Sequence, residues 1–503
     1  MSLFPINPRG KRVLLIETAA AIAVAVVVAG CGSTYRPVVT PINPSGPAPQ
    51  PSALAVVVSS TSTTAPGIAT VIDYSGDTIM ALAPIGPGPL AFSVDENGTT
   101  GYTVNSDGTV TNFPVSSQLQ EKNITYSTLP AAAQSVGLFS PSAGLWVADL
   151  DGNVADVLTG SPETFKLTIP VAPTPVAIEG AAVLGERNYA ISLNTTTTST
   201  LTYQDMTCNT APATVTQTGE ADALEVASYS VSARIPLGAC PDYGIQSYDS
   251  RRFFVLNRGS DTITVINSQN NTLDSCAPFT NQNGQPVTCH PTLPLSTTAV
   301  TATGITPPNG TTGMAATAGP VYGEYLPATQ QLVVSNYDGG TVSVIDVSLD
   351  EYGNDSPTFG TTYTIPVGTN PASVTALSDG SRAYTANQAD GTVTIVNLTS
   401  HTVEKTLTVV GHPRTVVSTS NSLYGKVYVA SPDSNYLTII RTDQDIIDTT
   451  ILVQGNIVDV RVSNQNGVSG NYNTASRRPG AGQPCYLPGA AAEATLALCQ
   501  QLP

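Results

Sequence analysis

The sequence predicts an all-β fold, a β-propeller of four-stranded blades, and three observations support this class. The 503 residues include 42 Gly and 39 Pro, spread between short apolar runs, which indicates many turns and few long helices. The runs are rich in β-branched residues and about five to eight residues long, as in antiparallel strands. A unit of about 42 residues, the length of one propeller blade, recurs along the chain.

Composition narrows the function before any motif is considered. Lys and Arg number 19 against 36 Asp and Glu, a formal charge of −17. No nucleic-acid partner is expected, because such a chain cannot displace phosphate counterions. Charged residues make up 11% and hydrophobic residues 41%, so a large core can form and general disorder is excluded.

The pattern of residues 1–30 predicts an export signal. Arg9, Lys11 and Arg12 precede an apolar run over 13–28, and small residues follow, the pattern of a cleavable secretory signal. An uncleaved anchor is the alternative, but about 16 residues is short for a membrane span.

The string Val28-Ala29-Gly30-Cys31 resembles the lipobox of bacterial lipoproteins. The resemblance implies that Cys31 is acylated, becomes the mature N-terminus, and holds the protein on a membrane. Gly32 follows, where Asp would resemble an inner-membrane retention signal. We therefore expect an extracytoplasmic lipoprotein, at the outer membrane or cell surface rather than the inner membrane.

Residues 31–52 are expected to form a solvated tether, because they show no apolar periodicity and are rich in proline. The prolines are Pro37, Pro41, Pro44, Pro47, Pro49 and Pro51.

Six cysteines besides Cys31 predict disulfides, since an even number in an exported chain favours pairing. They are Cys208, Cys240, Cys276, Cys289, Cys485 and Cys499. The connectivity stays open; nearest-neighbour pairing is the simplest, and Cys276 with Cys289 and Cys485 with Cys499 would each close a short loop. No CxxC occurs, which argues against zinc, thioredoxin chemistry and covalent haem.

The clearest repeat unit covers residues 371–411. A first run at 372–377 turns at Ser378-Asp379-Gly380 into a second run at 382–387; Asp390-Gly391 then turns into a third at 392–397, and the fourth ends at 411. We expect the glycine of each Asp-Gly turn to adopt a positive φ. The same turn recurs at Asp107-Gly108, Asp151-Gly152 and Asp338-Gly339.

The second strand of the unit recurs as an aromatic or apolar residue, small and branched residues, and a polar end. It occurs at 102–105, 146–149, 189–192, 254–257, 333–336, 384–387 and 428–431. The units end in an Ile-Pro pair, found at Ile169-Pro170, Ile235-Pro236 and Ile365-Pro366. Proline suits an outer edge strand, because the N–H that it lacks would have no strand partner there.

These strings resemble the YVTN-type β-propeller repeat family, whose blade has Y-V-T/A-N, then a TVSVID-like strand, then an IPVG-P exit. Residues 341–346 and 365–371 match closely. The resemblance covers about 400 residues and implies a fold only, since such propellers include enzymes, adhesins and plain binding surfaces.

Blades are expected to begin near residues 90, 136, 176, 243, 320, 372, 414 and 456. The last is incomplete, and runs at 54–59, 68–74 and 78–83 can complete it, so that both termini close a ring of eight over 53–463. Seven blades remain the alternative. Insertions near 176–242 and 243–319, with four cysteines, are the expected place for protein-specific features. Residues 464–503 form a Gly, Asn and Pro-rich appendage, with a short helix possible at 490–498.

Chemical motifs are few. His290 beside Cys289 and His401 at a hairpin are expected to be loop residues, and no histidine has a partner at metal-ligand spacing. Residues 149–153 resemble the start of a calcium loop but lack the distal Glu, so a hairpin turn is expected, with no metal and no cofactor. His412 and Arg414 in a blade exit, with Arg382, are candidates for a pocket at the channel mouth.

Two functional classes remain. We expect a binding or scaffold propeller for a surface protein or polysaccharide, without catalytic residues, because charge and histidine are scarce. The alternative is an enzyme similar to lactonase-like or quinoprotein-like propellers, which requires three or more ionisable groups converging at the channel mouth.

Overall fold

The computed structural model describes residues 54–463, except 96–97, 131–134, 140–143, 150–151, 182–186, 195–217, 248, 250, 282, 296–317, 351 and 420–424. Outside the described residues lie the signal and lipobox with Cys31, the tether, Cys208, the appendage at 464–503, Cys485 and Cys499. Among the helices of the described part, none is long and apolar enough to cross a membrane.

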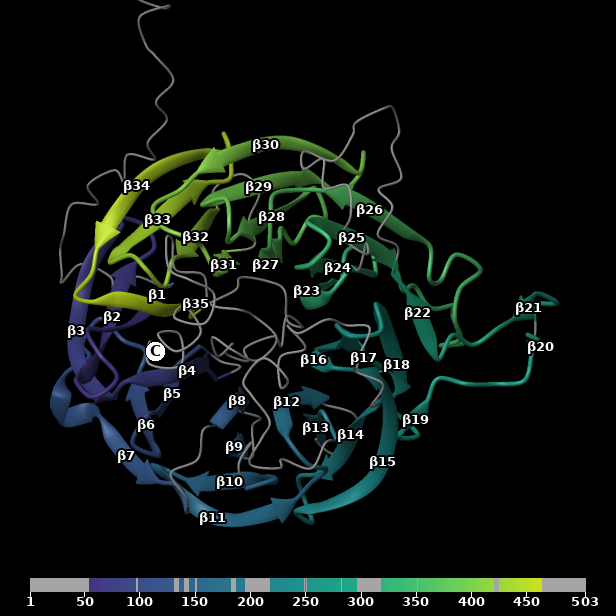
Figure 1. Ribbon diagram of the computed structural model, residues 1–503, viewed down its shortest axis with the longest axis horizontal. Coiled ribbons are helices and arrows are strands. Elements are labelled where there is room, and N and C mark those ends of the chain that lie inside the picture. The colour runs from purple at the N-terminus through teal and green to yellow at the C-terminus, as the bar shows by residue number, and fades with distance from the viewer. Residues whose placement is uncertain are drawn as a thin grey trace, which may run out of the picture. The chain divides into compact units, whose positions relative to one another are not determined.

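Eight sheets form a ring (Figure 1), each with its strands in the order A, B, C, D from the centre outward, and the A strands of successive sheets contact one another. Blade 1 is β4 (Pro89–Val94), β5 (Thr100–Asn105), β6 (Thr109–Pro114) and β7 (Thr125–Thr128). Blade 2 is β8 (Ser135–Phe139), β9 (Leu145–Asp149), β10 (Val154–Gly160) and β11 (Glu163–Pro170). Blade 3 is β12 (Pro175–Ala181), β13 (Arg187–Ser192), β14 (Thr218–Glu225) and β15 (Ser230–Ala239).

Blade 4 is β16 (Pro241–Gln246), β17 (Arg252–Asn257), β18 (Thr262–Asn267) and β19 (Thr272–Leu273), with β22 (Thr292–Pro294) also paired to β18. Blade 5 is β23 (Pro320–Leu326), β24 (Gln331–Asn336), β25 (Thr341–Asp346) and β26 (Thr362–Pro366). Blade 6 is β27 (Pro371–Ala376), β28 (Arg382–Asn387), β29 (Thr392–Asn397) and β30 (Thr402–Thr408). Blade 7 is β31 (Thr415–Ser418), β32 (Lys426–Ala430), β33 (Tyr436–Arg441) and β34 (Ile446–Leu452). A separate hairpin, β20 (Phe279–Thr280) and β21 (Pro286–Val287), and a 3-10 turn, η1 (Glu121–Asn123), complete the described elements.

Blade 8 joins the two ends of the chain. Its A strand is β35 (Asn456–Val462), and its B, C and D strands are β1 (Leu54–Ser60), β2 (Pro66–Asp73) and β3 (Thr78–Pro87). β35 pairs antiparallel with β1, with Val460 opposite Val57. The expected eight blades and the closure by both termini are confirmed, and seven blades are excluded.

The core lies between the blades rather than at the centre of the ring. All seven residues of β1 are buried, because each blade is covered on both faces by its neighbours. One hydrophobic cluster joins Val57 and Val460 of blade 8 to Tyr428 and Leu437 of blade 7. The short apolar runs of the sequence are therefore buried inter-blade strands.

An asparagine at the end of strand B fixes the turn into strand C. Asn387 Nδ2 donates to Thr392 Oγ1 (3.0 Å) and Thr394 Oγ1 (2.8 Å). Blades 1, 4 and 5 repeat this pair of bonds with Asn105, Asn257 and Asn336. The recurrent polar end of strand B is thus a buried amide that binds two hydroxyl groups of strand C.

The aromatic residue three positions earlier reaches the C-to-D turn of the next blade. Tyr189 Oη donates to Asn271 Oδ1 (2.7 Å), and Tyr102 Oη donates to Glu163 Oε1 (2.8 Å). Tyr384 makes the same contact with Asp445. This aromatic residue therefore ties each of these blades to its successor.

The predicted turn conformation holds in two Asp-Gly turns and is wrong in two. Gly108 and Gly391 have φ of 78° and 64°. At 338–340 the positive φ falls on Gly340, and at 151–153 it falls on Asn153. In all four turns the left-handed residue is the one directly before strand C, so its position relative to the strand, and not the Asp-Gly pair, locates it.

We predict that Gly368→Ala destabilises the ring. A Cβ there would lie 2.5 Å from Cγ and 2.6 Å from Nδ2 of Asn387, whose amide is held by two hydroxyl groups, so the expected loss in the free energy of unfolding is about 1–3 kcal/mol. Gly76 is exposed, and the nearest atom, an oxygen of half-buried Asp73, would lie 3.2 Å away, so Gly76→Ala should stay within about 0.5 kcal/mol of the parent. Urea unfolding measures both; equal losses would contradict the steric explanation.

Candidate functional site

Polar side chains of the A strands cap the free edge of the next A strand. Thr375 Oγ1 accepts the N–H of Ser418 (3.2 Å), and Ser373 Oγ accepts the N–H of Val416 (3.0 Å). Glu324 Oε2 accepts the N–H of Ala376 (2.9 Å). Because an innermost strand has one edge without a strand partner, these side chains satisfy backbone groups around the ring.

The end of the ring that carries the D-to-A loops and B-to-C turns, called here the DA face, has an ion pair between blades 4 and 5. Arg258 binds Asp338 through Nε (2.9 Å) and Nη2 (2.7 Å). Burial lowers the pKa of Arg258, but the hydrogen bond and charge of Asp338, with the charge of Asp242, raise it above its ordinary value. Tyr337 Oη then donates to Gln388 Oε1 of blade 6 (3.1 Å). These side chains connect blades 4, 5 and 6.

The structure places His412 and Arg414 at the DA face of blade 7. His412 Nδ1 lies 2.6 Å from Asp433 Oδ2, and the His412 N–H donates to Asp433 Oδ1 (2.8 Å). Arg414 is 1% exposed and its guanidinium donates to the carbonyl oxygen of Val458 in blade 8. The histidine is thus oriented by a carboxylate, and the arginine lies between blades.

Arg382 lies at the opposite end of its blade, which carries the A-to-B and C-to-D turns. It pairs with Asp445 and donates to the carbonyl oxygen of Thr442 (2.8 Å). Strand B runs antiparallel to strand A, so the first residue of strand B lies away from the DA face. The structure therefore brings His412 and Arg414 to one face and does not bring Arg382 to them.

In other blades too, a basic residue at the start of strand B contacts the next blade. Arg187 Nη1 donates to the carbonyl oxygen of Ser268 (2.8 Å), and Lys426 Nζ donates to that of Tyr74 (2.9 Å) and to Asp77 (2.6 Å). Arg382 is one member of this series of inter-blade contacts.

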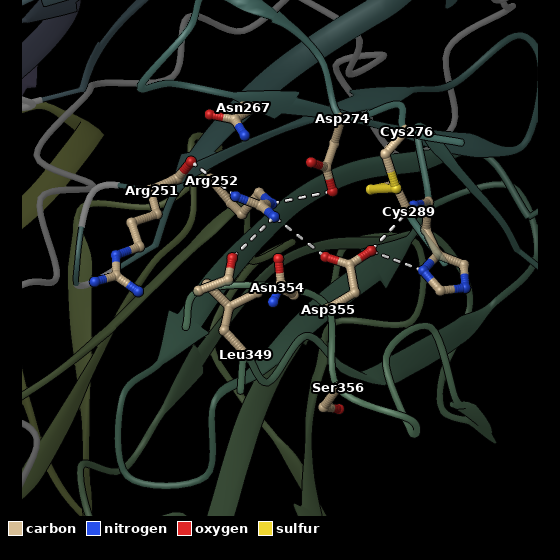
Figure 2. Close-up of polar contacts among 12 residues, drawn as sticks. Arg251, Arg252, Asn267, Asp274, Cys276, Cys289, Leu349, Asn354, Asp355 and Ser356 are labelled. Atoms are coloured by element: carbon tan, nitrogen blue, oxygen red, sulfur yellow. Dashed lines mark hydrogen bonds and ion pairs between the residues drawn. A yellow bond between two sulfur atoms is a disulfide. The ribbon is translucent and has the colours of Figure 1, made fainter. Parts of the chain in front are cut away.

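A larger buried cluster joins the insertion of blade 4 to that of blade 5 (Figure 2). Arg252 Nε lies 3.1 Å from Asp274 Oδ2, and its Nη2 lies 3.3 Å from Asp355 Oδ1. The other oxygen of Asp355 lies 2.8 Å from His290 Nδ1 and accepts the His290 N–H (3.0 Å). Arg252 matches the strand-B series, but both aspartates lie in insertions without a repeat equivalent, so sequence spacing could not reveal them.

A disulfide closes this insertion next to the cluster. Cys276 and Cys289 are bonded, with Cα atoms 5.4 Å apart, which confirms the expected disulfide. Cys240 is also disulfide-bonded, and its partner lies outside the described residues. His290 stacks on Phe359 and His401 on Tyr363, at 5.3 and 3.7 Å between centroids, and burial lowers the pKa of His401.

Metal-ligating side chains do not gather in threes within the part of the chain that the structure describes. The pairs Arg258–Asp338, His412–Asp433 and Arg252–Asp274 each join separate segments of the chain.

Comparison with known proteins gives the fold. No family model matches the chain, and neither does any curated protein. Apo AztD from Citrobacter koseri superposes with a TM-score of 0.52 at 12% identity, over 82% of this chain and 97% of that one. The dihydro-heme d1 dehydrogenase NirN, in complex with DHE, gives a TM-score of 0.50 at 14% identity, over 81% of this chain and 74% of that one. The likeness is one of fold: this chain is a β-propeller.

We predict that Asp274→Asn flattens the pH dependence of stability. The pKa of Asp274 is raised from 3.8 to about 6, mainly by burial and also by the charge of Asp355, while Arg252 lowers it in part. Because the folded protein holds a proton that the unfolded chain has lost, stability falls as pH rises from about 4 to about 6, by an amount on the order of 2 kcal/mol.

Thermal unfolding at about pH 4 and about pH 7 measures this slope. The variant should lose less stability than the parent across that interval. An unchanged difference would show that Asp274 does not carry the proton.

Proposed function

We propose that this chain is an extracytoplasmic, membrane-anchored binding or scaffold protein that presents a surface of its propeller to a protein or a polysaccharide. The proposal rests on one structural observation, a stiffened projection from blades 4 and 5. The export and lipidation motifs of the sequence support its location.

The projection, called here the arm, comprises residues 274–291 with β20 and β21, which Figure 1 shows outside the ring of blades. The Cys276–Cys289 disulfide closes its base, and the Arg252 cluster holds that base to the blade 5 loop. At its outer part Asn281 Nδ2 approaches Asp350 Oδ2 of that loop at 3.5 Å. These contacts pre-organise the arm, which lowers the entropy cost of binding.

Aromatic side chains of the arm and of the adjoining loop face solvent. Phe279 is 44% exposed and Tyr352 46% exposed. Aromatic residues on a rigid support are typical binding anchors. The arm adds no strand to the closed ring, which favours a role in recognition over a role in stability.

The paired ionisable groups of the DA face favour binding over catalysis. A general acid or base is most effective when its pKa lies near the working pH, whereas Asp338 raises the pKa of Arg258 away from neutrality. Arg258, Asp338 and Arg414 on this face connect blades and thus serve the fold.

Export is supported by the disulfide. Cys276 and Cys289 are oxidised partners, and such bonds persist in oxidising compartments outside the cytosol. Mass spectrometry of membrane-extracted protein should find an acylated Cys31 as the first residue and a bonded Cys276–Cys289 pair. An intact signal segment with free thiols would overturn the proposed location.

We predict that Phe279→Ser with Tyr352→Ser weakens binding to the cell envelope. The matched control is Tyr126→Ser with Phe165→Ser, two aromatic residues on outer strands, 54% and 38% exposed. Binding of the full chain to immobilised envelope polysaccharide and to purified envelope proteins should weaken at least about tenfold for the arm variant only. Equal weakening of both variants, or of neither, would contradict a binding role for the arm.

A further inference from the structure

Blade 2 departs from the pairing that ends strand B elsewhere. In blades 1 and 6, an asparagine closes strand B and a threonine of strand C binds its amide. In blade 2 these two positions are Asp149 on β9 and Asp156 on β10. The registers agree: Asp156 lies opposite Val147, two residues before Asp149, as Thr394 lies opposite Thr385, two residues before Asn387.

The two carboxyl groups of blade 2 occupy positions whose side chains meet in other blades, and the charge of Asp149 acts on Asp156. In blades 1 and 6, the side chains at these positions approach to 2.8 Å, so the backbone directs both toward one point. Asp149 Oδ1 accepts the N–H of Gly152 (2.8 Å). Asp156 is 0% exposed, and neither of its oxygens has a hydrogen-bond partner.

An unpaired buried carboxylate beside a second carboxylate costs several kcal/mol unless an opposite charge compensates it. Within the described part of the chain, no Lys, Arg or His forms an ion pair with Asp156, and the charge that acts on it is that of Asp149, which repels it. Either a proton or a positive charge from outside these side chains must therefore compensate it.

We propose that Asp149 and Asp156 together bind a divalent cation of the calcium class. Carboxylate oxygens are the donors that Ca²⁺ prefers, and Ca²⁺ tolerates irregular geometry. The spacing of residues 149–153 indicated only a turn, because no distal Glu follows along the chain; the second acidic ligand instead comes from the paired strand.

Blade 3 provides an internal comparison. Asp222 of β14 holds the same position, opposite Ala190, two residues before Ser192. Its Oδ2 accepts the N–H of Ala172 (2.5 Å), and its Oδ1 lies 3.6 Å from Arg234 Nε. The chain itself compensates this carboxylate, so Asp222→Asn is the matched control for Asp156→Asn.

The single tryptophan of the sequence makes the site directly measurable. Trp146 lies on β9, three residues from Asp149 and opposite Val157 of β10, about 10 Å from Asp149 along the strand. Tb³⁺, a luminescent probe for calcium sites, should therefore show saturable emission on tryptophan excitation of the full chain, displaced by excess Ca²⁺.

Asp156→Asn should reduce this emission at least tenfold, whereas Asp222→Asn should keep it within twofold of the parent. The double variant Asp149→Asn with Asp156→Thr recreates the pair of blades 1 and 6, so it should fold and give no emission. Absence of emission in the parent, or equal emission in Asp156→Asn, would overturn the proposal.

Thermal unfolding supplies a second readout. Adding CaCl₂ in place of EDTA should raise the melting temperature of the parent and of Asp222→Asn, but not that of the double variant. If Ca²⁺ leaves the melting temperature of the parent unchanged and only acidification raises it, the two carboxyl groups share a proton. That result would also overturn the cation site.

Discussion

The pairing of β35 with β1 is the constraint on which the rest of the structure depends. Strands from opposite ends of the chain meet in one blade, with Val460 opposite Val57, so the ring has no blade that lacks a neighbour. Closure also fixes the faces of every blade, because each sheet is buried only when both neighbours are present. The inter-blade hydrophobic clusters and the turn contacts of strand B follow from that geometry.

Closure determines how the few charged residues are used. Only 11% of residues are charged, and several of the basic ones sit at the start of strand B, where they bind the next blade's C-to-D turn, as Arg187, Arg382 and Lys426 do. A side chain fixed in this way stabilises a blade interface and offers little to a substrate. This is consistent with the proposal that recognition uses segments outside the repeat, chiefly the arm.

The repeat predicts the blades because the same residue types make the same local contacts in several units. Asn387 must bind two hydroxyl groups, and Tyr384 must reach the next turn. The sequence alone groups Arg382 with His412 and Arg414, because sequence order does not show that strands A and B start at opposite ends of a blade. The Arg252–Asp274–Asp355 cluster has no signal in the sequence, because its acids lie in insertions, where no periodicity relates residues distant in sequence.

The departures from the repeat fall where a propeller can accept them. Each blade contacts only its two neighbours, so replacing an amide–hydroxyl pair by two carboxyl groups in blade 2 leaves the remaining blades unchanged. The free-energy cost of burying these carboxyl groups arises within blade 2 and has to be offset by groups near them. In blade 3, Arg234 and the Ala172 N–H do this for Asp222. A buried charged residue that differs from its repeat equivalents and lacks such compensation is therefore the place to seek a ligand. Burying its charge destabilises the blade, and a bound ligand can supply the free energy that offsets this loss.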